Sequence, residues 1–382
     1  MAFGIICEYN PFHNGHLHQI NEIKKTSDEP IVCVMSGNFT QRGEIAIIDK
    51  YARAKMALEC GADLVLELPM PYCIASAEYF ASAGVKILYS LGVDKLSFGS
   101  ESADAEKIIK IARIAVLDEF KHECANLSKE QGSASAYFDL LAEKSGCEAI
   151  KSNDILAIEY TKAIIKSGYK MQICPIKREG NAYRDTELSL GALPSASAIR
   201  EVISRGKCDE IASFVPAATL DILKGNELAD FNNVKEKILL TLRLIDGENL
   251  NVAISDKGLV NRILSTAHKC ASFDEFECKL QTKKYTASAI RRAILYILLG
   301  IQSGDLDSTT QYTVLLGANE RGREYLSLIR KSESEIRVIT KPADAKEGRQ
   351  LELSKKADAL YTMCFENKKE SGFYIRKSPI IV

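Results

Sequence analysis

The sequence has no tryptophan, which excludes no class of protein. It also has no long apolar run, which argues against a membrane-spanning protein. A membrane-spanning helix needs about 18 consecutive apolar residues, and no stretch of this chain reaches that length. The N-terminus, MAFGIICEYN, has no basic region and carries Glu8 early, unlike a secretory signal. We therefore expect a soluble, cytoplasmic protein that has no membrane partner.

The chain also lacks an excess of charge of either sign. Its 50 lysines and arginines nearly balance its 51 aspartates and glutamates, so the formal net charge is −1. Any contact with nucleic acid must then come from a local basic surface. The 11 cysteines include no C-x-x-C pair, which argues against a zinc ribbon or a redox dithiol. We expect reduced thiols, no tightly bound metal ion and no obligate protein partner.

Short apolar runs alternate with amphipathic stretches through residues 1–205, a pattern typical of a parallel α/β sheet. Residues 50–61 have apolar side chains at helical spacing and end in Gly61, which favours a helix. Residues 104–160 look mainly helical, and the segment is longer than one crossover between two parallel strands needs, which indicates an inserted helical layer. The predicted strands are Phe3–Glu8, Ile31–Ser36, Leu64–Leu68, Lys95–Phe98 and Met171–Ile176.

The pattern changes after about residue 205. Apolar stripes predict helices around 234–245 and 290–301, and short strands are predicted at Tyr312–Gly317 and Ile336–Thr340 around a helix at Gly322–Arg330. The length allows two or three domains at roughly 100–200 residues each. We expect a catalytic domain at 1–205 and a mostly helical domain, containing a small α+β element, at 206–382.

The most informative segment is GIICEYNPFHNGHLHQI, residues 4–20. A predicted strand runs into a polar turn, and His13-Asn14-Gly15-His16 then opens a helix. Exposed N–H groups and the positive end of a helix dipole meet there, and two imidazoles one turn apart can hydrogen-bond a phosphate. The alternatives are that both histidines are helix caps or core residues, or that they bind a metal. No acidic or cysteine partner stands near them to favour the metal.

A second polar segment, SGNFTQRGE at 36–44, ends the second predicted strand and reaches the same edge of the sheet. Asn38, Gln41, Arg42 and Glu44 are candidates for orienting a substrate. Arg42 suits a carboxylate substrate, or it pairs with Glu44.

Two short segments echo one another, SASAIR at 195–200 and TASAIRR at 286–292. Ser195 and Ser197 stand at a helix start with Arg200 one turn later, which suits phosphate binding; the alternative is a simple N-cap by Ser195. The second echo lies between Cys278 and Gly304, where basic residues occur without any acidic one. This segment is our candidate for contact with a nucleic-acid backbone, or it is a solvated helix start. The candidate residues are Lys283, Lys284, Arg291 and Arg292.

The H-N-G-H sequence at 13–16 resembles the H-x-G-H motif of the nucleotidyltransferase superfamily. The longer strings EYNPFHNGH (8–16), MSGNFTQRGE (35–44), KMALECGADLVLELP (55–69) and RKSPII (376–381) resemble the tRNA(Met) cytidine acetate ligase family. The resemblance implies a Rossmann-like nucleotidyltransferase core. It also implies activation of acetate by ATP, with Mg²⁺ screening the triphosphate, and transfer of acetyl to N4 of the wobble cytidine of elongator tRNA(Met). No K-M-S-K-S-like sequence is present to favour an aminoacyl-tRNA synthetase.

The resemblance also implies roles for individual residues. His13 and His16 would stabilise the transition state, and Gly99, Asn153 and Arg178 would bind ATP. Without the resemblance, these last three fit a turn, a helix cap and a solvated loop charge. The remaining ATP-binding candidates are Ile6, Cys7, Glu8, Tyr9, Asn10, Pro11, Phe12, Asn14, Gly15, Leu17, His18 and Gln19. Two other functions stay open, an adenylyltransferase acting on a phosphorylated small molecule and a non-catalytic RNA-binding protein.

Overall fold

The computed structural model describes residues 1–131, 133–147, 150, 152–178, 195–247, 250–254, 256–282, 284–307, 309–329, 335–345 and 348–382. The side chains of residues 127–131, 133–136, 152 and 153 lie outside that description.

The core is a mostly parallel sheet in the order β5-β4-β1-β2-β3-β6-β7. All five strands predicted in the first region are confirmed, and they pair in parallel. Residues of β2 and β3 are buried throughout, as expected for strands covered on both faces. The strands are β1 (Phe3–Cys7), β2 (Ile31–Ser36), β3 (Leu64–Leu68), β4 (Lys95–Ser100) and β5 (Gln172–Lys177).

The strands of the second region extend this same sheet. β6 (Tyr312–Ala318) pairs antiparallel with β3, and both β7 (Arg337–Ile339) and β8 (Ile380–Ile381) pair with β6. The predicted α+β element is therefore a continuation of the core sheet rather than a separate unit. The predicted domain boundary near residue 205 therefore separates two groups of strands that belong to the same sheet.

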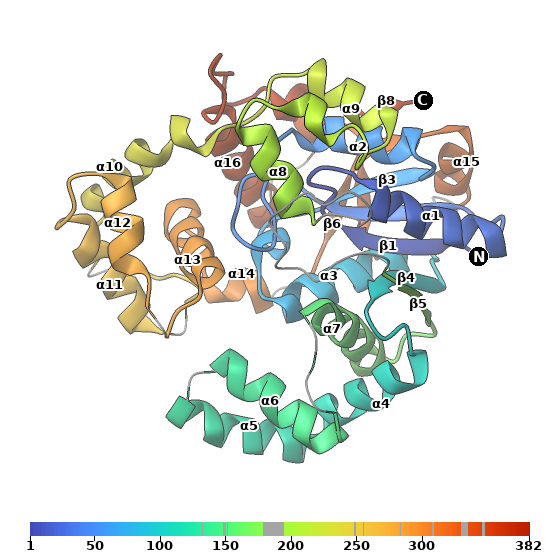
Figure 1. Ribbon diagram of the computed structural model, residues 1–382, viewed down its shortest axis with the longest axis horizontal. Helices are drawn as coiled ribbons and strands as arrows, with labels where there is room; N and C mark the ends of the chain where they lie inside the picture. The colour runs from blue at the N-terminus through green and yellow to red at the C-terminus, as the bar shows by residue number, and fades with distance from the viewer. Residues whose placement is uncertain are drawn as a thin grey trace.

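Helices cover both faces of the sheet. Figure 1 shows α1 (Asn14–Thr26) and α2 (Lys50–Glu59) over one face, and α3 (Ala77–Ser90) and α7 (Ser152–Ser167) over the other. The helical insertion predicted at about 104–160 is confirmed as α4 (Ala105–Val116), α5 (Asp118–Gln131), α6 (Ser133–Ser145) and α7. Its helices have a small core of their own, around Ile111, Phe120 and Leu141.

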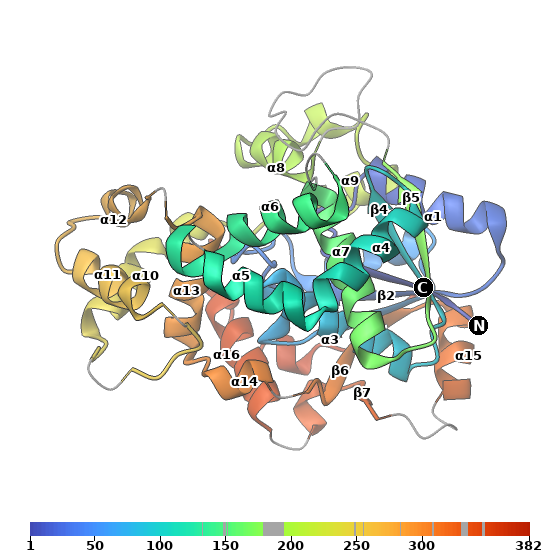
Figure 2. The same cartoon turned by 90° about the horizontal axis from the view of Figure 1, so that it is seen from below.

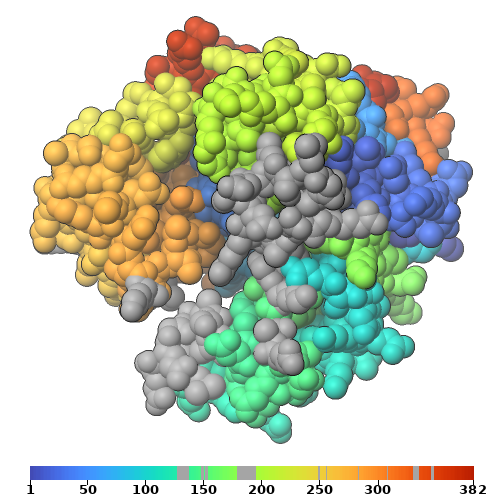
Figure 3. All heavy atoms as spheres, in the orientation of Figure 1, coloured from blue at the N-terminus to red at the C-terminus, as the bar shows by residue number. Residues whose placement is uncertain are grey.

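A group of helices stands beside the sheet, and we call residues 235–299 the helical region. It comprises α10 (Lys235–Leu244), α11 (Lys257–Ala267), α12 (Phe273–Leu280) and α13 (Ala287–Leu299). Figure 3 shows this region as a lobe on one side of the molecule, and Figures 1 and 2 place it at the opposite end from α15 (Glu320–Ile329). The remaining helices are α8 (Ala196–Ser204), α9 (Ala217–Lys224), α14 (Ser303–Asp307) and α16 (Arg349–Thr362). Among the described residues no helix combines the length and apolarity that crossing a membrane requires.

Candidate active site

The turn from β1 into α1 holds the two motif histidines in a reciprocal helix cap. The N–H of Gly15 donates to Nδ1 of His13 at 3.0 Å, and the N–H of His13 donates to Nδ1 of His16 at 3.2 Å. The two rings stack with centroids 3.7 Å apart and planes 22° apart. Since each Nδ1 accepts a hydrogen bond, each neutral ring carries its proton on Nε2. The cap uses only the Nδ1 atoms and leaves each Nε2–H as a donor, so capping and phosphate binding are compatible roles.

Burial keeps both rings neutral. It lowers the pKa of His13 to about 3, helped by the positive charges of Arg178 and Arg200. It also lowers the pKa of His16 well below the ordinary value, with further contributions from His13 and Arg178. At neutral pH the two imidazoles are therefore uncharged hydrogen-bond donors, and the positive charge near them comes from the arginines.

This burial predicts a pH-dependent stability. Below the ordinary pKa of 6.5 the unfolded chain binds a proton on His13, whereas the folded chain does not until about pH 3. The free energy of unfolding should thus fall as the pH drops from about 6.5, with His13 contributing about 3 kcal/mol of loss at pH 4. Asparagine retains a capping side chain without titrating, so His13→Asn should show a shallower loss in urea denaturation at pH 7 and pH 4. The same substitution at exposed His268 is the control, and equal pH slopes in wild type and His13→Asn would contradict this prediction.

Several predicted ATP-binding side chains pack behind the turn. Tyr9, Asn10 and Phe12 are 1%, 3% and 0% exposed. The rings of Tyr9 and Phe12 pack against His16, with centroids 4.8 and 5.4 Å away. In α1, the Gln19 side chain donates to Ser97 Oγ at 3.2 Å. The ATP-binding role of this segment stays a prediction, and for the buried members it would rest on the backbone.

An arginine that the sequence did not single out ties this turn to the loop after β2. Arg53 is fully buried in α2 and donates to the carbonyl of Glu8 at 2.6 Å, to that of Ser36 at 3.2 Å, and to that of Gly37. The carboxylate of Glu8 in turn accepts the N–H of Gln41 at 2.7 Å. Burial raises the pKa of Glu8. The ends of β1 and β2 are thus locked together at the edge of the sheet that carries the histidines.

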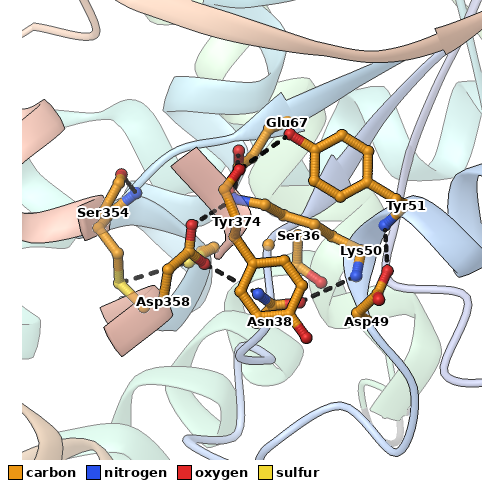
Figure 4. A network of polar contacts seen from close by, with 12 residues as sticks. Ser36, Asn38, Asp49, Lys50, Tyr51, Glu67, Ser354, Asp358 and Tyr374 are labelled. Atoms are coloured by element: carbon orange, nitrogen blue, oxygen red, sulfur yellow. Dashed lines mark hydrogen bonds and ion pairs between the residues drawn. The ribbon is translucent and has the colours of Figure 1, made fainter. Parts of the chain in front are cut away.

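The loop from residue 37 to 49 is anchored by a buried ionic network (Figure 4). Lys50 Nζ donates to both oxygens of Glu67, at 2.8 and 2.9 Å, and to Asp358 at 2.8 Å. Asn38 donates to Asp358 at 2.8 Å and accepts the N–H of Lys50 at 2.9 Å. Burial alone would lower the pKa of Lys50, but the two carboxylates raise it. Asn38, a candidate for orienting substrate, is therefore committed to holding the loop.

Arg200 reaches the histidine turn from α8. It donates to the carbonyl of Asn10 at 3.0 Å, to Glu44 Oε2 at 3.1 Å and to Ser197 Oγ at 3.3 Å. Ser195 is the N-cap of α8, and its Oγ accepts the N–H of Ala198 at 3.2 Å. Two of the three predicted phosphate contacts, Ser197 and Arg200, therefore lie together beside the turn. The third, Ser195, serves as the cap.

The two echoing segments turn out to be matching helix starts. Thr286 caps α13 as Ser195 caps α8, and Arg291 follows its cap at the same spacing as Arg200. Both arginines bind Glu44, with Arg291 on Oε1 at 2.5 Å and Arg200 on Oε2 at 3.1 Å. Glu44 thus joins the helical region to the histidine turn.

Gly99 and Arg178 meet across neighbouring strands. The N–H of Arg178 donates to the carbonyl of Ser100 at 3.1 Å. A Cβ added to Gly99 would stand 3.2 Å from Arg178 Cγ, so glycine leaves room for the arginine stem. Asn153 lies in the first turn of α7, and its side chain is outside the described residues. Two of these three candidates therefore stand together near the histidines.

Adding a branched side chain at position 99 should displace Arg178 from the site. We expect Gly99→Val to raise the KM for ATP about tenfold while the protein stays folded, because the crowded atoms belong to a flexible side chain. Steady-state kinetics at varied ATP would measure this effect, with Gly304→Val, where a Cβ meets nothing within 4 Å, as the control. An unchanged KM would show that Gly99, a residue of β4, has no part in ATP binding.

Three of the four candidate tRNA-binding residues have partners inside the protein. Lys284 binds Asp256 at 2.8 Å, and Arg292 donates to the carbonyl of Gln41 at 3.4 Å. Arg291 binds Glu44, and Lys283 lies outside the described residues. These contacts reduce the charge that the segment offers to RNA, and the tRNA-binding role of all four stays a prediction.

Comparison with known proteins identifies the class. A family model described as "HIGH Nucleotidyl Transferase" matches residues 1–373, and the chain belongs to that family. It is 40% identical to the tRNA(Met) cytidine acetate ligase of Acetivibrio thermocellus, over 96% of this chain and 95% of that protein. Within the class, the chain is a member of the tRNA(Met) cytidine acetate ligase family, which confirms the resemblance seen in the sequence.

Two crystal structures of Thermotoga maritima TmcAL have the same fold. The apo form matches with a TM-score of 0.90 at 31% identity, covering 100% of both chains. The form bound with alpha-thio ATP matches with a TM-score of 0.87 at 30% identity, covering 100% of this chain and 99% of that one. The predicted nucleotidyltransferase core is thereby confirmed.

Proposed function

We propose that this chain is an ATP-dependent acetate ligase that forms acetyl-adenylate and transfers the acetyl group to N4 of the wobble cytidine of elongator tRNA(Met). The observation that carries the chemistry is the pair of stacked neutral imidazoles with Nε2 donors, next to Arg178 and Arg200. The substrate is supported by the name of the full-length relatives, and the use of ATP by the nucleotide analogue bound to Thermotoga TmcAL.

In the first step, an acetate oxygen attacks the α-phosphorus of ATP and pyrophosphate leaves, which gives acetyl-AMP. Negative charge grows on the oxygens around phosphorus, and the donors of His13 and His16 are fixed in advance to stabilise it. Arg200 and Ser197, which are hydrogen-bonded to each other beside the turn, would hold the leaving pyrophosphate, and Arg178 would add positive charge beside the histidines. Neutral donors suit this task because they need no proton uptake before each turnover.

Mg²⁺ would reach this site with the nucleotide. Within the described ranges, no group of three or more His, Cys, Asp or Glu side chains is placed to hold a metal ion. Mg²⁺ is commonly held by phosphate oxygens and water together with one or two carboxylates, so a resident protein cage is not required.

In the second step, the cytidine N4 attacks the acetyl carbonyl of acetyl-AMP. A carbon–nitrogen bond forms, the bond to the phosphate oxygen breaks, AMP leaves, and N4 loses one proton to solvent. The aromatic amine is a weak nucleophile, so the activated acyl group and its positioning supply the rate. The base must leave its stack to reach a protein site. Because the substrate is a tRNA, we place this reaction in the cytoplasm.

Incubation with ATP, labelled acetate and bulk tRNA tests the proposal, followed by nucleoside analysis. We expect labelled N4-acetylcytidine in RNA together with free AMP and pyrophosphate. An adenylyltransferase would instead leave AMP in a small-molecule product. Label in acetyl-AMP but never in RNA would refute the tRNA substrate, and absence of ATP turnover would refute the ligase chemistry.

A further inference from the structure

A cavity opens between the loop after β2 and the helical region. Its volume is about 270 Å³, and the side chains around it include Ile238, Leu280 and Ile294, which are 4%, 1% and 7% exposed. Protein interiors rarely leave voids larger than a water molecule. A space of this size lined by otherwise well-buried apolar residues is therefore suited to a ligand.

One side of the cavity is aromatic. The rings of Phe231 and Phe273 pack edge to face with centroids 5.3 Å apart, and those of Phe273 and Phe276 lie 5.5 Å apart. Phe231 is 38% exposed, although Phe273 and Phe276 are buried. Proteins that bind unpaired RNA stack the bases on such side chains, because every base offers a flat face.

Two of the polar side chains at the cavity are carboxylates, which only accept hydrogen bonds when ionised. The polar side chains that line it are Glu44, Glu277, Gln281 and Arg291. Glu44 is bound by two arginines, whereas Glu277 Oε1 stands 3.6 Å from Arg291 Nη2, beyond hydrogen-bond distance. Glu277 thus keeps capacity to accept a donor. A carboxylate recognises the exocyclic amine of cytosine or adenine, and two carboxylates beside one guanidinium disfavour an anionic headgroup or phosphate.

The cavity also borders the nucleotide site. Glu44 lines it and binds Arg200, and Arg200 donates to the carbonyl of Asn10 in the histidine turn. Resting on the function proposed above, we propose that this cavity receives one unstacked nucleobase of the RNA substrate. The base is a cytosine or an adenine, with its ring beside Phe231 and Phe273 and its amine on Glu277.

Ala287 gives a direct test because it lines the cavity, is exposed and is the first residue of α13. Ala287→Phe fills the space from its rim, and Ala287→Ser is the matched control. Binding of an anticodon stem-loop RNA should weaken about tenfold or more in Ala287→Phe and stay unchanged in Ala287→Ser. The probes are this RNA and a series in which each loop base in turn is removed to leave an abasic site.

Removing one particular base from the RNA should weaken its binding to wild type as much as Ala287→Phe does. The same abasic RNA should bind Ala287→Phe no more weakly than the intact RNA does, because both changes delete the same interaction. Replacing that base by uracil should weaken binding to wild type but not to Glu277→Gln, which lacks the carboxylate. An unchanged affinity in Ala287→Phe overturns the proposal, as does an equal further loss for every abasic RNA. Adenylate formation without RNA checks that Ala287→Phe is folded.

Failure of the proposed function gives a different result. If wild type forms no N4-acetylcytidine in bulk tRNA, the proposed ligase reaction is wrong. If wild type acetylates the RNA and Ala287→Phe does so equally well at limiting RNA, the reaction stands and only the base cavity is refuted.

Discussion

Replacing His16 by alanine is expected to slow acetyl-adenylate formation by about 10²–10³-fold, and His13→Ala should do the same. Each substitution removes one fixed donor to the charge that develops at phosphorus, a loss of about 2.7–4 kcal/mol in transition-state stabilisation. Affinity for an ATP analogue should change much less, because the donors matter most when charge has built up. Acetate-dependent exchange of pyrophosphate into ATP measures the effect.

The double variant should be little worse than either single variant. Both rings accept backbone N–H groups of the same helix start and they stack on each other, so each helps to position the other and the effects should not add. His122→Ala on the surface of α5 is the control and should keep the full rate. A loss below tenfold in both single variants would show that the histidines only cap the helix.

Lys50→Met is expected to destabilise the protein by about 3–5 kcal/mol. It removes the ammonium between Glu67 and Asp358 and leaves two buried carboxylates without their cation. Lys55→Met is the matched control, because Lys55 lies in the same helix and forms an exposed pair with Glu59 at 3.5 Å, a kind of pair that contributes little. Chemical denaturation at neutral pH measures the difference between the two variants.

Acidification should reduce the difference in the free energy of unfolding between Lys50→Met and wild type. Burial already raises the pKa of Glu67, and losing Lys50 raises it further. The penalty for an unpaired carboxylate is therefore present at high pH and declines as falling pH protonates the group. A gap that stays constant from neutral to acidic pH would contradict the electrostatic explanation and point to lost packing.

Local sequence patterns predicted the parallel sheet and the histidine turn. The strands of the first region are short buried runs that end in turn residues, and the cap at His13 and His16 involves neighbours in the chain. Such features depend on few residues, which is why sequence alone can indicate them. The pairing of β6 with β3 depends on residues far apart in the sequence, so the pattern predicted the strand but not its sheet.

The polar residues that organise the site were harder to predict. Arg53 stands in a helix whose apolar face carries Tyr51, Ala54 and Leu58, where a lone arginine looks solvent-exposed, yet it is fully buried. Lys50 and Asp358 are 308 positions apart, and no local pattern links them. Glu44 belonged to a candidate loop, but its two arginine partners come from separate helices and could be identified only from the fold.

The central claim is that the Nε2 atoms of His13 and His16 hold the innermost phosphate of ATP. A crystal structure of this protein with alpha-thio ATP tests it most directly. We predict both Nε2 atoms at about 2.7–3.2 Å from oxygen or sulfur atoms on the α-phosphorus. A nucleotide bound with its α-phosphate away from both rings, while their cap stays intact, would contradict the claim.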